Sequence, residues 1–379
     1  APPARWWQPQ ADGRILCTLC PRYCRMADGQ AGFCFIRQNH GGQLVQLGYG
    51  RSTGFAVDPI EKKPLNHFFP GTPVLSFGTA GCNLGCKFCQ NWDISKAKLD
   101  EQGLRRNTPD DVVDLAVAQG APSIAYTYND PVIWAEYVTD IARAARHRGI
   151  HNVLVTAGYV TDEARPELYA DADAANVDLK AFSEDFYRKT TASHLEPVLE
   201  TLKWIRHNSS TWLEVTTLLI PGHNDSDDEL RRLSQWFAAN LGPDVPLHFT
   251  AFHPDFTMTD VPATPPETLR RARAIARAAG LRYVYVGNVH DEDGQTTTCA
   301  RCARPLIGRD WYAITYFALE HGACAHCGHP LPGRFGAAPV ALRSGFRRLR
   351  VSIQSETLGG SPNPPATGSR KRSSRSPTR

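Results

Sequence analysis

The stretch Gly78-Thr79-Ala80-Gly81-Cys82-Asn83-Leu84-Gly85-Cys86-Lys87-Phe88-Cys89-Gln90-Asn91 places three cysteines in a C-x3-C-x2-C spacing. A short apolar run, Val74-Leu75-Ser76-Phe77, precedes it. Soft thiolate ligands favour iron–sulfur clusters, zinc or copper(I). The next cysteine, Cys299, is far downstream. The spacing therefore predicts a cluster with one open iron, where a small molecule can bind. The alternative is three buried or zinc-binding thiols.

With the aromatic Phe88 just before the last cysteine, this stretch resembles the signature of the radical S-adenosylmethionine (SAM) superfamily. The resemblance implies that Cys82, Cys86 and Cys89 hold a [4Fe-4S] cluster whose open iron binds the amino and carboxylate groups of SAM. It also implies that the reduced cluster donates an electron that cleaves SAM to methionine and a 5′-deoxyadenosyl radical.

The bulk composition is that of an ordinary globular chain. It has 379 residues, of which 42% are hydrophobic and 21% charged, so a large core is expected. It contains no run of 18 apolar residues that would span a membrane. The stretch Ala1–Trp7 lacks the form of a signal peptide. We therefore expect a cytoplasmic protein without membrane association.

The eleven cysteines and the uneven distribution of charge narrow the classes of protein to which the chain could belong. The cysteines cluster in short spacings, which favours metal ligation in a reducing compartment over disulfides. From Ser355 onward five basic residues oppose one acid, 5 − 1 = +4, which equals the net charge of the whole chain. The body of the protein is therefore nearly neutral, and a nucleic-acid-binding role is not expected.

Residues 1–70 form an expected cysteine-rich N-terminal segment. Cys17, Cys20, Cys24 and Cys34 could close a metal site, either zinc or a second cluster, and the alternative is partly buried free thiols. A strand is expected at 43–50. The polar, proline-bounded stretch Asp58–Leu65 is expected to be a surface loop that packs over the cluster, and Asp58–Pro70 is expected to help close the pocket.

Residues 71–288 alternate between strand-like and helical patterns, which predicts an α/β fold with a parallel sheet curled into a partial (β/α) barrel. Thr108 with Asp111, and Ser226 with Glu229, are expected to cap helices. Ligands gather at the C-terminal ends of such strands. The expected strands are 74–79, 123–128, 152–157, 175–180, 212–220, 246–252 and 282–287. The expected helices are 109–119, 131–148, 162–171, 184–191, 195–208, 227–241 and 265–279.

Two further segments complete the chain. Residues 289–335 contain two C-x2-C pairs, which resemble a zinc ribbon and predict a structural Zn²⁺ site. The four expected ligands are Cys299, Cys302, Cys324 and Cys327. Residues 336–379 are expected to be a basic, largely disordered tail.

Several short segments of the sequence, taken together, resemble the radical SAM enzymes of the AmmeMemoRadiSam system, which are relatives of pyruvate formate-lyase activating enzymes. The resemblance covers about residues 5–335 and implies genetic association with AMMECR-type and Memo-type proteins. The segments are Cys17–Cys24, Asp58–Leu65, Cys82–Asn91, Val177–Lys180, Ile220–Asp225, Phe252–Asp255 and the distal C-x2-C pairs.

The same resemblance implies a set of SAM-binding positions. Phe88 would lie by the adenine, and Asn129-Asp130 would occupy the position of a Gly-Gly-Glu or Asn-Glu element near the SAM amino group. The shorter Asp130 puts a direct carboxylate contact in question. The remaining positions, near the ribose and carboxylate of SAM, are Thr156, Asp178 and Lys180.

The expected function is therefore that of a radical SAM enzyme that abstracts hydrogen from an unidentified substrate, with a glycyl residue of a partner protein as one target class. A small metabolite or a modified side chain is the other target class. An external one-electron reductant of the flavodoxin or ferredoxin type is implied. The alternative is a non-catalytic metal-binding scaffold.

Overall fold

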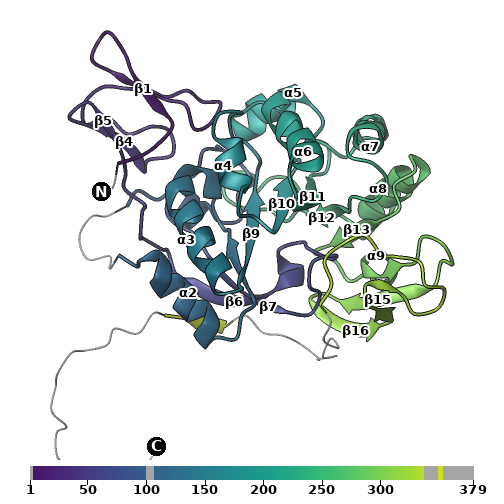
Figure 1. Cartoon of the computed structure of the whole chain (residues 1–379). Helices are drawn as coiled ribbons and strands as arrows, with labels where there is room; N and C mark the ends of the chain where they lie inside the picture. The colour runs from purple at the N-terminus through teal and green to yellow at the C-terminus, as the bar shows by residue number, and fades with distance from the viewer. Residues whose placement is uncertain (1–2, 100–105, 337–348, 353–379) are drawn as a thin grey trace, which may run out of the picture.

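Nine strands form one open, mostly parallel sheet at the centre of the protein (Figure 1). The computed structural model describes residues 3–99, 106–336 and 349–352. The strand order is β13-β12-β11-β10-β9-β8-β7-β6-β19, and neighbours from β7 to β13 run parallel. The expected strands and their parallel arrangement are confirmed. The seven parallel strands are β7 (Pro73–Phe77), β8 (Ser123–Tyr126), β9 (His151–Thr156), β10 (Ala174–Asp178), β11 (Trp212–Leu219), β12 (Leu247–Ala251) and β13 (Val284–Gly287).

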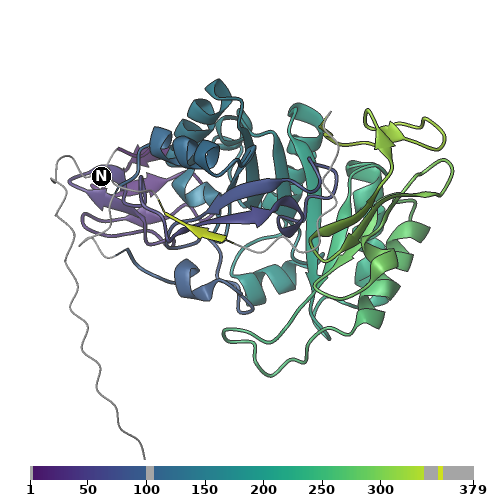
Figure 2. The same ribbon diagram turned by 90° about the horizontal axis from the view of Figure 1, so that it is seen from below.

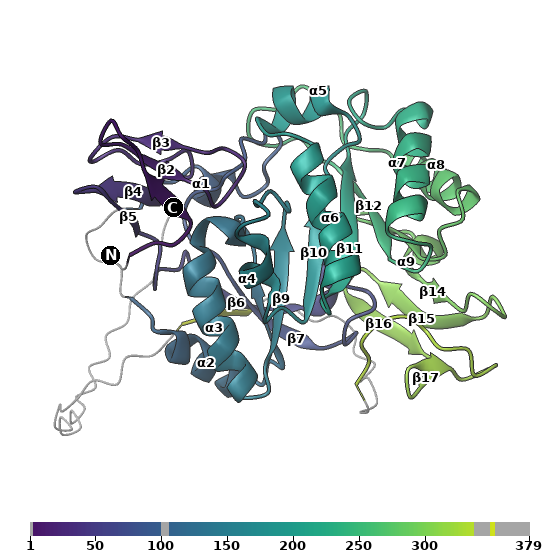
Figure 3. The ribbon, with the colours of Figure 1, turned by 45° about the horizontal axis from the view of Figure 1, so that its top comes forward.

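Helices connect these strands and cover the outer face of the sheet (Figure 3). The capping box of α2 forms as predicted between Thr108 and Asp111. At α7 only half of the capping box forms. The Ser226 hydroxyl accepts from the Glu229 amide, but the Glu229 carboxylate accepts from the amide of Phe182. The helices are α2 (Pro109–Ala118), η2 (Pro131–Trp134), α3 (Ala135–His147), α4 (Arg165–Tyr169), α5 (Glu184–Phe186), η3 (Tyr187–Thr191), α6 (Glu196–Asn208), α7 (Asp227–Asn240), α8 (Pro266–Ala278) and the one-turn α1 (Trp92–Ser95) and α9 (Glu292–Gln295).

Alternate residues of the parallel strands belong to two different apolar clusters, as the pleat of a strand requires. Leu75, Ile124 and Leu154 belong to the main core between sheet and helices. Their neighbours along the strands belong to a small inner cluster, which residues 60–68 cap at the N-terminal ends of the strands. The inner cluster is Ile60, Leu65, Phe68, Val74, Ala125, Val153 and Ala174.

The polar stretch Asp58–Leu65 is not the surface loop expected from its composition. Its first residues belong to β6 (Phe55–Pro59), which pairs antiparallel with β7, and η1 (Ile60–Lys62) follows. The register pairs Asp58 with Val74 at the start of β7, whereas the cysteines follow the end of that strand. The expectation that this stretch covers the cluster is therefore wrong. Composition misleads here because the charges compensate one another inside the protein.

That compensation is a buried ion pair between Asp58 and Lys63. The Lys63 ammonium donates to Asp58 Oδ2 at 2.7 Å, the Tyr128 hydroxyl donates to the same atom at 2.7 Å, and Lys62 donates to Oδ1 at 3.0 Å. Burial by itself would raise the pKa of Asp58, but the charge of Lys63 and these hydrogen bonds hold that pKa well below its ordinary value. Asp58 therefore remains ionised inside the sheet.

Two small cysteine-containing units adjoin the central sheet at different places (Figure 3). The N-terminal unit lies next to α1, and the C-terminal unit lies beyond β13. The strand expected at 43–50 is confirmed over β5. The N-terminal strands are β1 (Trp7–Pro9), β2 (Ile15–Cys17), β3 (Arg25–Met26), β4 (Arg37–His40) and β5 (Gln43–Gln46); the C-terminal ones are β14 (Thr297–Thr298), β15 (Pro305–Asp310), β16 (Ala313–Phe317), β17 (Leu319–Glu320) and β18 (Ala323–Cys324).

Two boundaries differ from those expected. β6 falls within the expected N-terminal segment 1–70, and β19 (Leu349–Val351) falls within the expected tail, yet both are strands of the central sheet. Figure 2 shows β19, in yellow, along the edge of the sheet beside β6. An edge strand offers unpaired backbone groups, which a short apolar segment can satisfy from far away in sequence.

The basic run Arg370–Arg375 lies outside the described residues. No described helix is long and apolar enough to cross a bilayer.

Replacing Lys63 with methionine should leave the Asp58 carboxylate buried without its closest cation. We expect the free energy of unfolding at pH 7 to fall by about 3–5 kcal/mol. The folded-state pKa of Asp58 is depressed, so its contribution to stability is present above the unfolded pKa of ~3.9 and is lost as the pH falls below it. The difference between K63M and the natural protein should therefore shrink at pH 3. Urea unfolding at both pH values measures it.

Lys62→Met is the matched control. Lys62 contacts the other oxygen of Asp58, but its side chain is 28% exposed, against 2% for Lys63. Its loss should cost about 1 kcal/mol or less. Equal losses for the two variants would contradict the argument from burial.

Candidate functional site: the cysteine loop

The loop Gly78–Asn91 leaves the C-terminal end of β7 and is held there by the side chain of Asn129. The Asn129 carboxamide accepts a hydrogen bond from the Thr79 amide at 3.1 Å and donates one to the Gly81 carbonyl at 2.9 Å. Asn129 follows β8, the neighbour of β7 in the sheet. Adjacent parallel strands end at the same edge, so the residue after β8 lies where the loop begins.

Two glycines make this close approach feasible. A Cβ at Gly78 would lie 2.4 Å from the Thr127 carbonyl oxygen, and a Cβ at Gly81 would lie 2.0 Å from that of Cys34. Gly81 also has a φ of +85°, which side chains rarely adopt. The glycines are therefore required by backbone packing.

Other segments that follow the later strands hold the rest of the loop. They bind it through backbone groups of their own, and none of these bonds uses a cysteine thiol. The bonds run from Asn83 Nδ2 to the Tyr159 carbonyl (2.9 Å), from the Gly85 amide to Thr191 (2.8 Å), from the Lys87 amide to Thr190 (3.0 Å) and from the Thr257 amide to the Lys87 carbonyl (3.1 Å).

The three thiols of the loop lie within electrostatic reach of one another. Burial raises the pKa of the Cys82 thiol to about 12, with a contribution from the charge of Asp130. Burial also raises the pKa of Cys86 to about 11, against the opposing effect of Lys180. Buried thiols of this kind ionise when a metal replaces the proton. The loop thus offers three soft ligands with a negative and a positive side chain nearby.

Asp130 and Thr156 lie together on the Asp130 side of the loop. Asp130 Oδ1 accepts from the Thr156 hydroxyl at 2.9 Å and from the Val132 amide at 3.0 Å, and Oδ2 accepts from the Ala157 amide at 2.8 Å. This carboxylate therefore joins the end of β8 to the end of β9, and its oxygens are already engaged by protein donors.

Lys180, Asp178 and Phe88 lie together near Cys86. Lys180 Nζ donates to Asp178 Oδ2 at 2.8 Å and lies 5.9 Å from the centre of the Phe88 ring. Burial opposes its charge, but Asp178 and Cys86 raise the pKa of Lys180 above its ordinary value. A permanently charged ammonium thus lies beside the cysteine loop.

The family of the chain follows from comparison with known proteins. Residues 77–234 match the family model described as the radical SAM superfamily. The chain is 42% identical over 330 residues to the uncharacterized protein MJ0808 of Methanocaldococcus jannaschii, which covers 86% of this chain and 98% of that protein. The chain belongs to the radical SAM superfamily.

More distant relatives include named enzymes. The pyruvate formate-lyase 1-activating enzyme of Escherichia coli is 24% identical over 237 residues, covering 57% of this chain and 93% of that protein. A solved radical SAM methyltransferase from Sphaerobacter thermophilus matches with a TM-score of 0.46 and 18% identity, covering 59% of this chain and 68% of that chain.

The cysteine loop fits the [4Fe-4S] cluster and SAM that this superfamily implies. It supplies three thiols and no other strongly binding side chain, which leaves one iron open. The Leu84 amide donates to Cys82 Sγ at 3.4 Å, and the Ser95 hydroxyl lies 3.1 Å from Cys89 Sγ. Hydrogen bonds to sulfur are among the means by which proteins adjust such clusters.

The distal group Cys299, Cys302, Cys324 and Cys327 is a compact candidate metal site. All four sulfurs lie within 4.8 Å of one another. Cys299 and Cys327 are 3.6 Å apart, and Cys302 and Cys324 are 3.7 Å apart. Tetrahedral ligation at a Zn–S distance of about 2.3 Å requires a sulfur separation of about 3.8 Å. The geometry fits one tetrahedral ion.

Sequence reasoning missed the positioning residues of the site. The contact of Arg22 with the Asn83 carbonyl joins the N-terminal unit to the cysteine loop, and Ser95 contacts Cys89. Neither carries a sequence signal, because each acts through a backbone or sulfur atom that only the fold brings close. The resemblance places Asn129 near the SAM amino group, and its carboxamide binds the cysteine loop.

Asn129→Leu should weaken cluster retention, because it keeps the approximate volume but removes both hydrogen bonds to the loop. Leaving the two buried backbone groups unpaired costs about 1–3 kcal/mol each. We expect iron and sulfide per chain after anaerobic reconstitution to fall by more than half. Asn152→Leu is the control, since Asn152 is equally buried and binds Tyr126 and Ala142 instead. The idea fails if both variants load alike.

Proposed function

We propose that this radical SAM protein reductively cleaves SAM at the cysteine loop and abstracts hydrogen from a substrate. The observation that carries the proposal is the loop itself, whose three thiols lie within electrostatic reach of one another while its backbone is bound by segments that follow successive strands. When bound there, the [4Fe-4S] cluster supplies one electron to SAM, and an external flavodoxin- or ferredoxin-type donor replenishes it.

The flanking side chains have separate roles in this proposal. Cys82, Cys86 and Cys89 hold the cluster, and Asn129 positions their loop. Lys180, held by Asp178 beside Phe88, supplies a point charge for the carboxylate of SAM. Asp130 and Thr156 fix the ends of β8 and β9, so that SAM contacts there fall to backbone groups.

A glycyl residue of a partner protein is the substrate class we favour. The support is similarity to several activating enzymes, at 22–25% identity. Exposed aromatic side chains near the loop, Phe33 (40% exposed) and Trp92 (45%), also suit a protein substrate. A small metabolite or a modified side chain is the second class. We further propose a cytoplasmic setting and membership of the AmmeMemoRadiSam system, with AMMECR-type and Memo-type partners.

A non-catalytic metal scaffold is the competing function. It is favoured by the engagement of Asp130 with protein donors, since that carboxylate has little capacity left for SAM. Formation of 5′-deoxyadenosine distinguishes the two.

The reconstituted, dithionite-reduced protein should convert SAM to 5′-deoxyadenosine and methionine. Cys86→Ala should reduce this product to the background of a protein-free control, because the cluster loses one of its three ligands. Cys302→Ala, at the distal site, is the matched cysteine control and should keep most of the activity per folded chain. Absence of product from a fully loaded natural protein would favour the scaffold.

Lys180→Met should weaken SAM binding more than it changes the maximal rate. Loss of a charge-assisted contact of about 1.5–3 kcal/mol corresponds to a KM for SAM raised roughly 10- to 100-fold. Lys189→Met is the control, because Lys189 forms a similar pair with Asp185 in an exposed position. An unchanged KM in K180M would remove Lys180 from the SAM site.

A further inference from the structure

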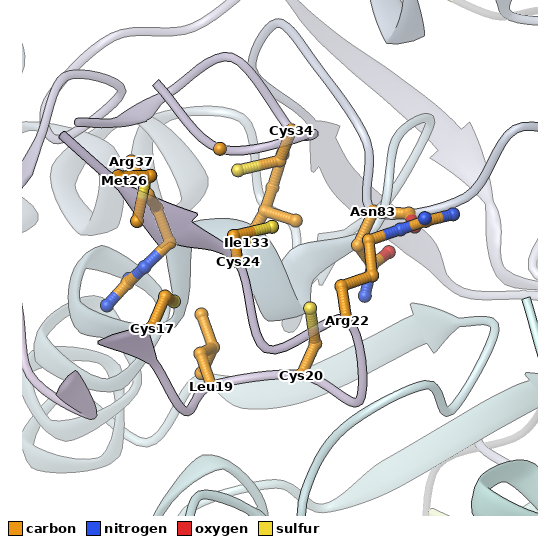
Figure 4. Close-up of a pocket in the computed structure, with 11 residues that line it drawn as sticks. Cys17, Leu19, Cys20, Arg22, Cys24, Met26, Cys34, Arg37, Asn83 and Ile133 are labelled. Atoms are coloured by element: carbon orange, nitrogen blue, oxygen red, sulfur yellow. The ribbon is translucent and has the colours of Figure 1, made fainter. Parts of the chain in front are cut away.

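The four N-terminal cysteines line one pocket beside the cysteine loop (Figure 4). Three of them, Cys17, Cys20 and Cys34, are buried, and Cys24 is partly buried. Figure 4 shows the sulfurs of Cys20, Cys24 and Cys34 directed into the pocket. Cys17, Cys24 and Cys34 all lie within electrostatic reach of Cys20. Ligands separated by as many as 17 positions in the chain are thus brought to one place.

The backbone of the N-terminal unit presents these thiols in a constrained way. The Cys17 amide donates to the Cys24 carbonyl at 3.0 Å, and the Tyr23 amide donates to that of Cys20 at 3.2 Å. Tyr23 and Phe35, each next to a cysteine, adopt left-handed conformations with φ of 46° and 67°. Such strain is retained where the surrounding structure imposes it, as at ligand sites.

Arg37 supplies an independent indication of a ligand. It lines the pocket, its side chain is 2% exposed, and it lies within electrostatic reach of Cys17 and Cys34. Its Nη1 donates to both oxygens of Glu136 at 2.9 Å, but its buried Nε has no hydrogen-bond partner among the described residues. An unsatisfied buried donor is costly. An anionic thiolate-bound centre would supply the missing acceptor.

We propose that Cys17, Cys20, Cys24 and Cys34 bind a second [4Fe-4S] cluster. Four thiolates meet the ligand requirement of such a cluster completely. The distal four sulfurs converge within 4.8 Å, as one ion requires, whereas the N-terminal four surround a pocket. A cluster of four irons needs that wider arrangement. Because all four irons have protein ligands, this centre would not bind SAM.

The pocket of the proposed cluster is lined in part by the cysteine loop. Asn83 of the loop lines the pocket, and Arg22 donates to the carbonyls of Asn83 and Ala192. Because Gly81 has no side chain, the loop can closely approach the backbone of Cys34. Assembly of the N-terminal centre would therefore order the neighbouring loop. This proposal goes beyond the proposed function and stands without it.

The test removes the loop ligands first. In the full-length variant C82S/C86S/C89S, anaerobic reconstitution should leave about four irons and four sulfides per chain, with the absorption and electron paramagnetic resonance signals of a [4Fe-4S] cluster. Adding C20S and C24S should remove them. Adding Leu19→Val instead, which changes an apolar residue lining the same pocket, should leave them in place. Metal bound at the distal four cysteines should be equal in all variants and reports that the chain is folded.

Three results would overturn the proposal. The first is the absence of iron from the loop-deficient variant C82S/C86S/C89S. The second is iron that persists after C20S and C24S are added. The third is the loss of one zinc per chain in place of iron. SAM cleavage by the natural protein is measured separately, so failure of the second cluster and failure of the proposed function are distinguishable.

Discussion

The carboxamide of Asn129, bound to the backbone on both sides of Ala80, is the interaction on which the site depends. A loop that presents three thiols to a ligand cannot also bury itself by closing over them. Its polar backbone groups must then be satisfied from outside, and a parallel sheet provides the means because its strands all end at one edge. Asn129 anchors the start of the loop, and segments near Tyr159, Thr190 and Thr257 anchor the remainder. The position of the loop thus rests on hydrogen bonds that involve no cysteine thiol.

The other end of the sheet is stabilised by buried charge. Asp58 and Lys63 neutralise each other there, and Glu214 accepts from His248 and from the amides of Asn66 and His67. His67 in turn contacts Tyr285 and the carbonyl of Pro332, which follows the distal cysteines in the chain. These groups tie the segment before β7 to the C-terminal unit. The two ends of the strands therefore differ: one carries paired buried charges, and the other carries the cysteine loop.

The three cysteine groups differ in environment more than in spacing. The distal sulfurs already approach the separation that a single tetrahedral ion imposes. The loop offers three thiols with the opposite charges of Asp130 and Lys180 nearby. The N-terminal four surround a pocket whose wall contains a buried arginine without a partner at Nε. Soft ligands alone do not distinguish these cases; the distance between sulfurs and the charge around them do.

The sequence by itself determined the class of the fold and the parallel strands, and it marked three cysteine groups as candidate metal sites, because apolar periodicity and short cysteine spacings are local properties. It also pointed to Lys180 beside Asp178; Lys180 lies beyond the end of β10, and the two side chains meet in an ion pair. Only the tertiary structure decided that Asp58 is buried, that β19 returns to the edge of the sheet, and that Asn129 binds the cysteine loop. Each of these depends on partners distant in sequence, whose charges or backbone groups become neighbours only when the chain is folded.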